Sequence, residues 1–293
     1  MRIINGGVAS AKGFETSSVE ANIKYKNRKD MSLIYSQAPC KMAGTFTKNV
    51  VKASCVLWDK ELNESGTDIH AVVINSGIAN ACTGKQGYDY CMKTAEAVAK
   101  VLPVKYHEVL VASTGVIGMQ LPIDKITNGV NALAISKEHS LEASVQSAKA
   151  IMTTDTKPKH IAVEVEIGGM CKGSGMIHPN MCTMLAFITT DVAISKELLQ
   201  EALSTDILDT YNMISVDGDT STNDTVLLLA NGLAENPTIT EKNQDYYTFL
   251  EALHYINEEF AKKIAGDGEG ATALVQAKVV NAKSKEDART IAK

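Results

Sequence analysis

Short runs of apolar and β-branched residues alternate along this chain with segments in which apolar residues recur every three or four positions. Runs with the length and composition of β-strands occur at 69–75, 108–114, 184–191, 225–230 and 271–280. The segment 160–167 alternates apolar and polar residues, as a half-buried strand does. Strands that alternate with helices predict an α/β architecture, and we expect mixed sheets sandwiched by helices.

The segments between these runs have helical periodicity. The apolar face of one predicted helix consists of Cys91, Ala95, Val98 and Leu102. Further helical patterns cover roughly 123–152 and 195–213, and Ser195 has the side chain of an N-cap. The apolar stripe of a long helix consists of Leu250, Leu253, Ile256, Phe260 and Ile264. Gly266 is expected to end that helix.

The last residues begin a helix that the sequence does not complete. Ser284 is a suitable N-cap, and Asp287 occupies the third helical position after it. An apolar face then starts, and the sequence stops at Lys293 before that face is finished. We therefore expect this chain to be a truncated product.

The composition and charge of the chain argue against two classes of binding partner, nucleic acids and membranes. Hydrophobic residues make up 45% of the 293 residues and charged residues 22%, as in an ordinary globular protein. The formal net charge is -5, and lysine and arginine are scattered along the chain. Since phosphate binding needs a basic patch, we expect no nucleic-acid partner. The N-terminus lacks the apolar stretch of a signal peptide, and no apolar run approaches the length of a membrane span, so no membrane partner is expected.

The cysteines indicate reduced thiols. They are Cys40, Cys55, Cys82, Cys91, Cys171 and Cys182. None forms a C-x-x-C pair, and no histidine lies near one at ligand spacing, so neither a disulfide framework nor a zinc site is expected. We expect a cytoplasmic protein without a metal.

The acidic segment 216–224 has some of the spacing of a calcium-binding loop. Asp217, Asp219 and Ser221 occupy positions 1, 3 and 5 of such a loop. Position 6 is Thr222 rather than glycine, and position 12 is Leu228 rather than glutamate. We interpret this segment as structural.

The stretch KGSGMIHPNMCTMLAFITTD at 172–191 is the richest in chemistry. From the residues alone it reads as a tight loop entering a core strand, in which Gly173 and Gly175 allow unusual backbone angles. The chain has no G-x-S-x-G motif, and no motif places a histidine beside a serine or cysteine nucleophile. This leaves room for a threonine freed at an N-terminus, whose α-amine titrates near ~7.7–8.0 and can accept the hydroxyl proton.

The same stretch closely resembles the self-processing site of the ornithine acetyltransferases, bifunctional glutamate N-acetyltransferase/amino-acid acetyltransferases with the pattern K-G-[SA]-G-M-x-x-P-x-x-A-T-M-L. The matching residues are Lys172, Gly173, Gly175, Met176, Pro179, Thr183, Met184 and Leu185. Further matches follow in the family's order: NSG-ANACTG at 75–84, STGVIG at 113–118, AIMTTDT at 150–156, SVDGDTSTNDT at 215–225 and GDGEG at 266–270. The resemblance covers essentially all of the chain and implies a DmpA/ArgJ-like fold.

Two residues and the chain end depart from the family. Cys182 stands where the family usually has alanine, and Ile78 replaces an asparagine. The family also continues beyond Lys293 with a segment that carries an asparagine and a threonine or serine of the substrate pocket.

The resemblance implies a chain that cuts itself between Cys182 and Thr183. Residues 1–182 would form an α chain with the oxyanion hole and the substrate lysine. Residues 183–293 would form a β chain that starts at the nucleophile, Thr183, and is incomplete at its C-terminus.

The resemblance also assigns the other site residues. Thr114 and Gly115 would form the oxyanion hole, and Thr153, Lys172 and Glu269 would bind substrate together with the nucleophile. Each also has an ordinary structural interpretation. Thr114 and Gly115 would form a strand-to-loop turn, and the Thr153 hydroxyl would bond nearby backbone. Lys172 would be a solvated lysine, and Glu269 would belong to a helix-ending loop.

The implied activity is transfer of acetyl from N-acetylornithine to glutamate through an acetyl-threonine intermediate, in arginine biosynthesis. No metal or organic cofactor is implied, and acetyl-CoA would be a second donor only in a bifunctional member. The fragments are expected to assemble as an α2β2 heterotetramer. Two alternatives stay open: a self-cleaving aminopeptidase or amidohydrolase of similar fold, and an uncleaved, inactive amino-acid-binding protein.

Overall fold

The computed structural model describes residues 2–164, 166–178 and 184–293. Its strands form a nine-stranded sheet in the order β1-β6-β7-β8-β9-β3-β4-β5, and β2 pairs with β3 beside this path. The strands are β1 Ile3–Ile4, β2 Phe14–Val19, β3 Met31–Phe46, β4 Ile69–Asn75, β5 Val109–Ser113, β6 Lys159–Val163, β7 Ile167–Lys172, β8 Leu185–Thr190 and β9 Thr225–Ala230.

The long strand β3 joins the two halves of the sheet. Its first part pairs antiparallel with β2 and β4, and its last part, 41–46, pairs antiparallel with β9. The register with β4 shifts between Tyr35 and Cys40, which is where β3 passes from one half to the other. The pairs β4–β5 and β8–β9 are parallel and the remaining pairs are antiparallel, so the sheet is mixed, as expected.

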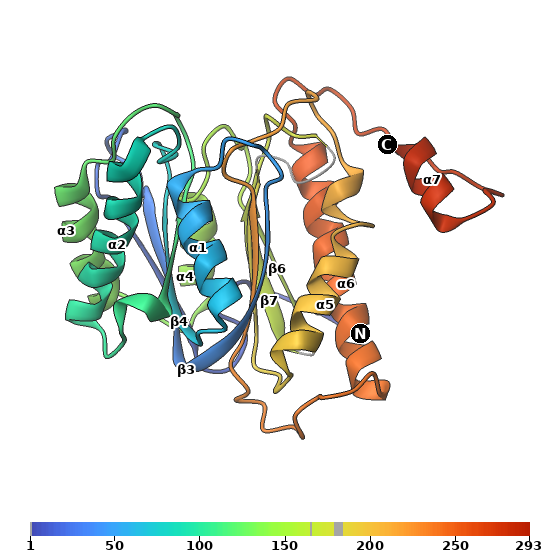
Figure 1. Cartoon of the computed structure of the whole chain (residues 1–293), viewed down its shortest axis with the longest axis horizontal. Helices are drawn as coiled ribbons and strands as arrows, with labels where there is room; N and C mark the ends of the chain where they lie inside the picture. The colour runs from blue at the N-terminus through green and yellow to red at the C-terminus, as the bar shows by residue number, and fades with distance from the viewer. Residues whose placement is uncertain (1, 165, 179–183) are drawn as a thin grey trace.

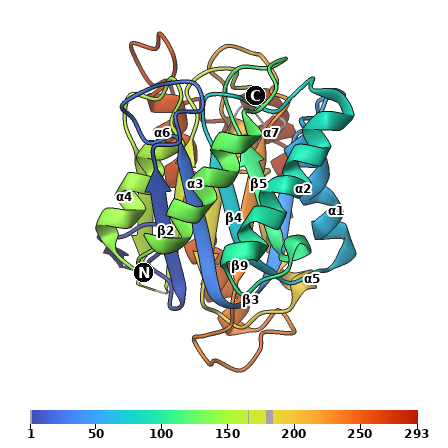
Figure 2. The ribbon, with the colours of Figure 1, turned by 90° about the vertical axis from the view of Figure 1, so that its left-hand side faces the viewer.

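Helices cover the strands on two sides (Figure 1). The α-helices are α1 Ser54–Ser65, α2 Gly84–Val101, α3 Ile123–Ile135, α4 Leu141–Ala150, α5 Lys196–Asp206, α6 Gln244–Gly266 and α7 Lys285–Ala292. Short 3-10 helices occur at Tyr106–Glu108 and Tyr211–Met213. In Figure 2, α2 and α3 lie in front of β3, β4 and β5, whereas α5 and α6 pack on the other side. The α/β sandwich predicted from the sequence is confirmed.

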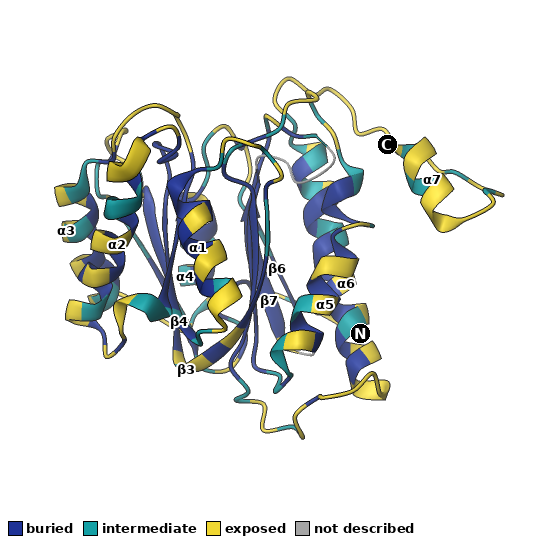
Figure 3. Cartoon of the chain, in the orientation of Figure 1, coloured by how far each residue is buried: buried dark blue, intermediate teal, exposed yellow. Residues whose placement is uncertain are grey.

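Two neighbouring strands divide their side chains between two apolar cores. In β8, Leu185 and Phe187 belong to the core shared with α1–α4, whereas Ala186 and Ile188 belong to the core under α5 and α6. Strand β9 alternates in the same way, because successive side chains of a strand point to opposite faces. Both strands are buried along their whole length, which explains their largely apolar sequence. Figure 3 shows that the strands between the helices are mostly buried.

Several predicted elements are confirmed at their expected positions. The runs 69–75 and 225–230 are β4 and β9, residue for residue. Ser195 caps α5 by accepting the amide N–H of Leu198 at 3.3 Å, and Ser284 caps α7 by accepting that of Asp287 at 3.0 Å. Gly266 is the last residue of α6.

Three predicted elements have different bounds. The segment 160–167 contains the end of β6 and the start of β7, because the chain reverses around Glu166, whose φ is +50°. The pattern over 123–152 is split into α3 and α4, since Ser140 starts a new helix by accepting the amide N–H of Ala143 at 3.1 Å. The helix predicted over 195–213 ends at Asp206.

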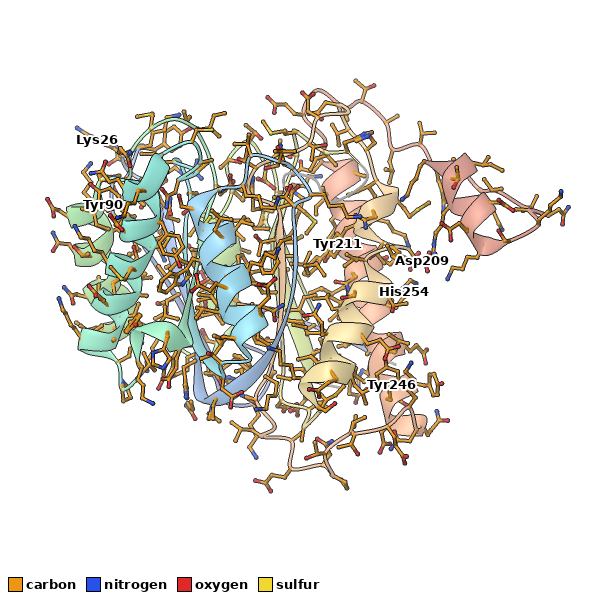
Figure 4. The ribbon with its side chains drawn as sticks, viewed as in Figure 1. Lys26, Tyr90, Asp209, Tyr211, Tyr246 and His254 are labelled. Carbon is orange, nitrogen blue, oxygen red and sulfur yellow. The ribbon has the colours of Figure 1, made fainter. Side chains whose placement is uncertain are left out.

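The strand predicted at 271–280 is wrong. This segment pairs with no strand in the described chain, and Leu274 and Val275 are 56% and 86% exposed. Its sequence has strand composition, but a strand also needs a neighbour to complete its hydrogen bonds. Helix α7 follows, apart from the main body (Figure 1), and Asp209 binds its Lys285 and Arg289 at 2.5 Å each; Figure 4 labels Asp209 on the side that faces α7.

Phe187 at the centre of β8 tests the sheet core. We expect Phe187→Ala to lower the free energy of unfolding by about 3–5 kcal/mol, because truncation loses apolar burial and leaves a cavity. Ile135→Ala is the control, since Ile135 is 87% exposed and its truncation should change stability by less than about 0.5 kcal/mol. Urea unfolding measures both. Equal losses would contradict this placement of the core.

Candidate active site

Lys172, at the end of β7, lies at the meeting point of three chain segments. Its Nζ donates to the Thr153 Oγ1 at 2.8 Å, and the Thr114 Oγ1 lies 3.3 Å away. The lysine is 2% exposed and Thr114 3% exposed, so both hydroxyls contact a buried ammonium. The structure thus brings together three residues that the sequence resemblance assigned to one site, and Lys172 is not a solvated surface lysine.

The turn after Thr114 can be formed only by glycine. Gly115 has φ +132°, and a Cβ there would lie 2.3 Å from the carbonyl carbon of Gly77. Thr114 donates its amide N–H to Asn75 O at 3.0 Å, and Val116 donates to Gly77 O at 3.1 Å. The backbone of 114–116 is therefore held directly against the turn that follows β4. Ile78, in that turn, is buried in the apolar core, which accounts for an apolar residue there.

A row of alternating charges fixes Lys172 in place. The carboxylate of Asp155 lies 3.9 Å from the Lys172 Nζ and 2.8 Å from the Lys159 Nζ. It also accepts the Gly173 amide N–H at 2.7 Å. Lys159 in turn binds Asp267 at 2.5 Å. The row alternates cation and anion, so each buried charge has an opposite neighbour, as buried charges require.

These contacts shift the pKa values of the row in directions that follow from burial and charge. Burial opposes ionisation of Asp155, but Lys172, Lys159 and the Gly173 amide outweigh it and lower the pKa of that carboxyl. Burial lowers the pKa of Lys172, and Asp155 offsets only part of the effect. For Lys159, Asp155 and Asp267 outweigh burial and raise its pKa. Asp155 is therefore a carboxylate at neutral pH, and its negative charge stabilises both ammonium groups.

The loop after α6 brings Glu269 to the same region. Asp267 anchors this loop by binding Lys159 and by accepting the Thr156 amide N–H at 3.1 Å. Glu269 donates its own amide N–H to Ser174 O at 2.6 Å. Its carboxylate lies over Gly175, where a Cβ would come within 2.6 Å of the Glu269 Oε2. Glu269 is exposed, so its carboxylate can receive a cation from solvent.

The segment 215–225, of which 216–224 was interpreted from its residues as structural, connects the parts of this site. The Asn223 Nδ2 donates to Ser113 O at 2.8 Å and to Ala79 O at 2.6 Å, which ties the two turns around Gly115. Asp217 accepts the Ile177 amide N–H at 2.8 Å, and Asp224 accepts the Met184 amide N–H at 3.0 Å. The sequence did not predict these contacts: the segment matches the family pattern, but a run of Asp, Asn, Ser and Thr is common in loops and does not indicate which groups it binds.

Cys182 and Thr183, between which the family resemblance predicts cleavage, lie outside the described residues. Ile177 and Met184, which precede and follow them in the sequence, are buried and are bound by Asp217 and Asp224. Leu185, which follows Met184, is the register partner of Lys172, so the chain resumes after this segment directly beside Lys172.

Comparison with known proteins identifies the family. The sequence pattern of the ArgJ family matches residues 15–293. The arginine biosynthesis bifunctional proteins ArgJ 1 of Clostridium acetobutylicum and ArgJ of Lactococcus lactis are 51% and 50% identical over 99% and 100% of this chain. The chain belongs to the ArgJ family. It spans 72% and 74% of the length of these two relatives.

Solved structures agree with ArgJ membership. The ornithine acetyltransferase of Mycobacterium tuberculosis complexed with ornithine is 37% identical, with a TM-score of 0.56 over 61% of this chain and 97% of that one. The ArgJ of Bacillus halodurans is 38% identical, with a TM-score of 0.55 over 61% of this chain and 96% of that one. An aminopeptidase of the Ntn hydrolase fold from Ochrobactrum anthropi covers 93% of this chain and 90% of its own at 11% identity and a TM-score of 0.53, which shows a shared fold alone. The DmpA/ArgJ-like fold is confirmed.

Asp155 is the residue on which this ArgJ site most depends. We expect Asp155→Asn to lower the free energy of unfolding by about 3–5 kcal/mol at neutral pH, because two buried ammonium groups lose their shared counter-ion. The folded-state pKa of Asp155 is lowered below its ordinary value of 3.8. Its stabilisation is therefore present above that value and disappears as pH falls through the folded pKa, so the difference between variant and wild type should shrink in acid.

The control is Asp68→Asn, which breaks the exposed pair with Lys41. That pair should be worth about 0–1 kcal/mol because solvent screens it. Urea unfolding at pH 7 and at pH 3 separates the two cases. A loss for Asp155→Asn as small as that for Asp68→Asn would contradict the role of the buried row.

Proposed function

We propose that this chain is an ornithine acetyltransferase of arginine biosynthesis, which transfers acetyl from N2-acetyl-L-ornithine to L-glutamate. The match to the ArgJ family over residues 15–293 carries this proposal. Relatives that are 50% and 51% identical are arginine biosynthesis bifunctional proteins, and a solved relative of 37% identity was complexed with ornithine.

In the proposed mechanism Thr183 is the nucleophile, released when the chain cuts itself after Cys182. The bonds that hold Ile177 and Met184 support this, because they fix described residues on both sides of the segment, and Leu185, directly after Met184, is the register partner of Lys172. The solved relatives match over 61% of this chain, which is close to the share that residues 1–182 hold in 293. A separate first fragment of this length is what cleavage at that position produces.

The charges of the site suit an amino-acid substrate. Lys172, with the hydroxyl of Thr153 beside it, would bind the α-carboxylate that N-acetylornithine and glutamate share. Glu269 would bind the ornithine side-chain ammonium or amine. Lys172 and Glu269 lie on neighbouring segments, because the Glu269 amide N–H donates to Ser174 O and Ser174 is two residues after Lys172.

Thr114 and Gly115 would stabilise the oxyanion of each tetrahedral intermediate. The missing side chain of Gly115 allows the backbone to approach a reacting carbonyl, and the turn is already fixed by Asn75 and Gly77. A preorganised donor of this kind is typically worth ~3–4 kcal/mol in the transition state.

The reaction then follows in two acyl transfers. The Thr183 hydroxyl attacks the acetyl carbonyl of N-acetylornithine while its own α-amine takes the hydroxyl proton, and ornithine leaves. The α-amine of glutamate attacks the acetyl-threonine ester, and the product leaves as N-acetylglutamate.

No metal or organic cofactor takes part in this mechanism, and acetyl-CoA would serve only as a second acetyl donor. We further propose an α2β2 assembly of the two fragments in the cytoplasm. Within the described residues, no helix has the length and apolar character needed to cross a membrane.

Self-cleavage and the acetyl-enzyme can be tested together by mass spectrometry. We expect wild-type protein to yield fragments 1–182 and 183–293, with threonine first in the second, and Thr183→Ala to stay whole. After brief exposure to N-acetylornithine, the second fragment should gain one acetyl group. Kinetics should give parallel double-reciprocal lines for N-acetylornithine and glutamate.

The outcomes separate the alternatives. A freshly folded wild type that stays in one piece would overturn the proposed nucleophile and favour an uncleaved binding protein. Cleaved protein that hydrolyses N-acetylornithine at a rate unaffected by glutamate would instead be an aminopeptidase or amidohydrolase.

Lys172 and Glu269 should differ in which substrate they affect. Each variant removes a charge-assisted bond worth ~1.5–3 kcal/mol, or about ten- to a hundred-fold in kcat/KM. Lys172→Met should lower kcat/KM for both substrates, because both carry the α-carboxylate. Glu269→Gln should harm N-acetylornithine more, because glutamate has no side-chain ammonium. Fragment yield is the folding control, and equal losses for both substrates in Glu269→Gln would refute its assigned role.

A further inference from the structure

Asp224, the residue before β9, carries a carboxyl group that the proposed mechanism does not use. It is fully buried. Its Oδ1 accepts the Met184 amide N–H at 3.0 Å, whereas its Oδ2 has no hydrogen-bond partner in the described part of the chain. A buried carboxyl oxygen without a partner is costly, so its presence needs a reason beyond the single bond to Met184.

The sheet fixes this carboxyl beside the start of β8. Thr225 donates its amide N–H to Met184 O at 3.1 Å, and Leu185 is the register partner of Thr225 in the parallel pair β8–β9. On the other side, Thr47 donates its amide N–H to Asp224 O at 2.9 Å. Through the hydrogen bond to Met184 N–H, the Asp224 carboxyl binds the backbone of the residue that follows the proposed nucleophile in the sequence.

The surroundings of Asp224 bring the pKa of its carboxyl close to neutral pH. Burial raises the pKa of Asp224 to about 8. The Met184 amide and the ammonium of Lys172 act in the opposite direction without cancelling the effect. Lys172 is the charged side chain that acts on it, from the end of β7. Such a group can both take up and release a proton near neutral pH.

The proposed function leaves one proton transfer without an acceptor. In the mature enzyme the free α-amine of Thr183 takes the hydroxyl proton. Before cleavage that nitrogen is part of the peptide bond to Cys182, and its lone pair is delocalised into the carbonyl, so it cannot act as a base. The precursor therefore needs a base that the mature enzyme supplies for itself.

We propose that Asp224 is the base of the self-cleavage step, an inference that rests on the proposed function. Its carboxylate takes the Thr183 hydroxyl proton as Oγ1 bonds to the Cys182 carbonyl carbon. The bond between that carbon and the Thr183 nitrogen then breaks, and the nitrogen takes the proton back from Asp224. The products are an ester and a free α-amine. Water hydrolyses the ester to the Cys182 carboxylate and the Thr183 hydroxyl, so all atoms and protons balance.

Asp224→Asn separates the proton transfer from the structural role. Asparagine keeps an oxygen for the Met184 amide and cannot take up a proton. In a cell-free pulse of synthesis followed by a chase at pH 6 to 9, denaturing gels would measure conversion of precursor into fragments. We expect Asp224→Asn to slow cleavage by about 10²–10⁴-fold. The matched control is Asp59→Asn: Asp59 is also buried and accepts a strand amide, Val111 N–H, at 2.9 Å, but should cleave at the wild-type rate.

The pH profile of the wild type provides a second test that does not depend on folding of a variant. Because the step needs ionised Asp224, the cleavage rate should rise almost tenfold per pH unit below about 8 and then level off. Asp224→Asn should lack this rise. Wild-type cleavage that is independent of pH between 6 and 9, or normal cleavage in Asp224→Asn, would overturn the role of Asp224 and leave the proposed function intact. A wild type that never cleaves, like Thr183→Ala, would overturn both.

Discussion

The site depends first on one buried carboxylate, that of Asp155. It contacts the ammonium groups of Lys172 and Lys159 and accepts the Gly173 amide N–H, so it fixes the end of β7. Through Lys159 it also reaches Asp267 and thereby the loop that carries Glu269. Burial lowers the pKa of Lys172, and the carboxylate of Asp155 acts against this and favours the charged form that would bind a substrate carboxylate.

The sheet explains how a chain could be cut beside this site and stay folded. Strands β8 and β9 follow the proposed cleavage position, yet they lie between β7 and β3, which precede it. Both are buried on two faces and are hydrogen-bonded to strands of the first part. Cleavage after Cys182 would therefore break one peptide bond and leave the hydrogen bonds of the sheet and both apolar cores in place. Met184, the residue after the new terminus, would keep its hydrogen bond to Asp224.

Sequence patterns predicted the elements whose signal is local. The runs that became β4 and β9 are apolar over strand length and end at polar or glycine-containing turns, so their bounds were predictable. Strand β3 and helix α1 were not predicted. Strand β3 changes partner along its length, and its mixed sequence, with Pro39 and several polar residues, follows from that change. The prediction of a strand at 271–280 was wrong for the opposite reason: the segment has the composition of a strand but no neighbouring strand in the described chain.

The sequence by itself determined the class of fold, the family and the chemical types in the site. Helical and strand periods are properties of neighbouring residues, and the motifs from 75 to 270 follow in the order of the ornithine acetyltransferases. Only the tertiary structure decided which of these residues meet. The contacts of Asp155 with Lys172, of Lys159 with Asp267, of Asn223 with Ser113, and of Asp224 with Met184 join segments that are separated along the chain. Their shared physical reason is burial: a charge or amide removed from water must find its partner inside the fold, and the sheet register selects that partner.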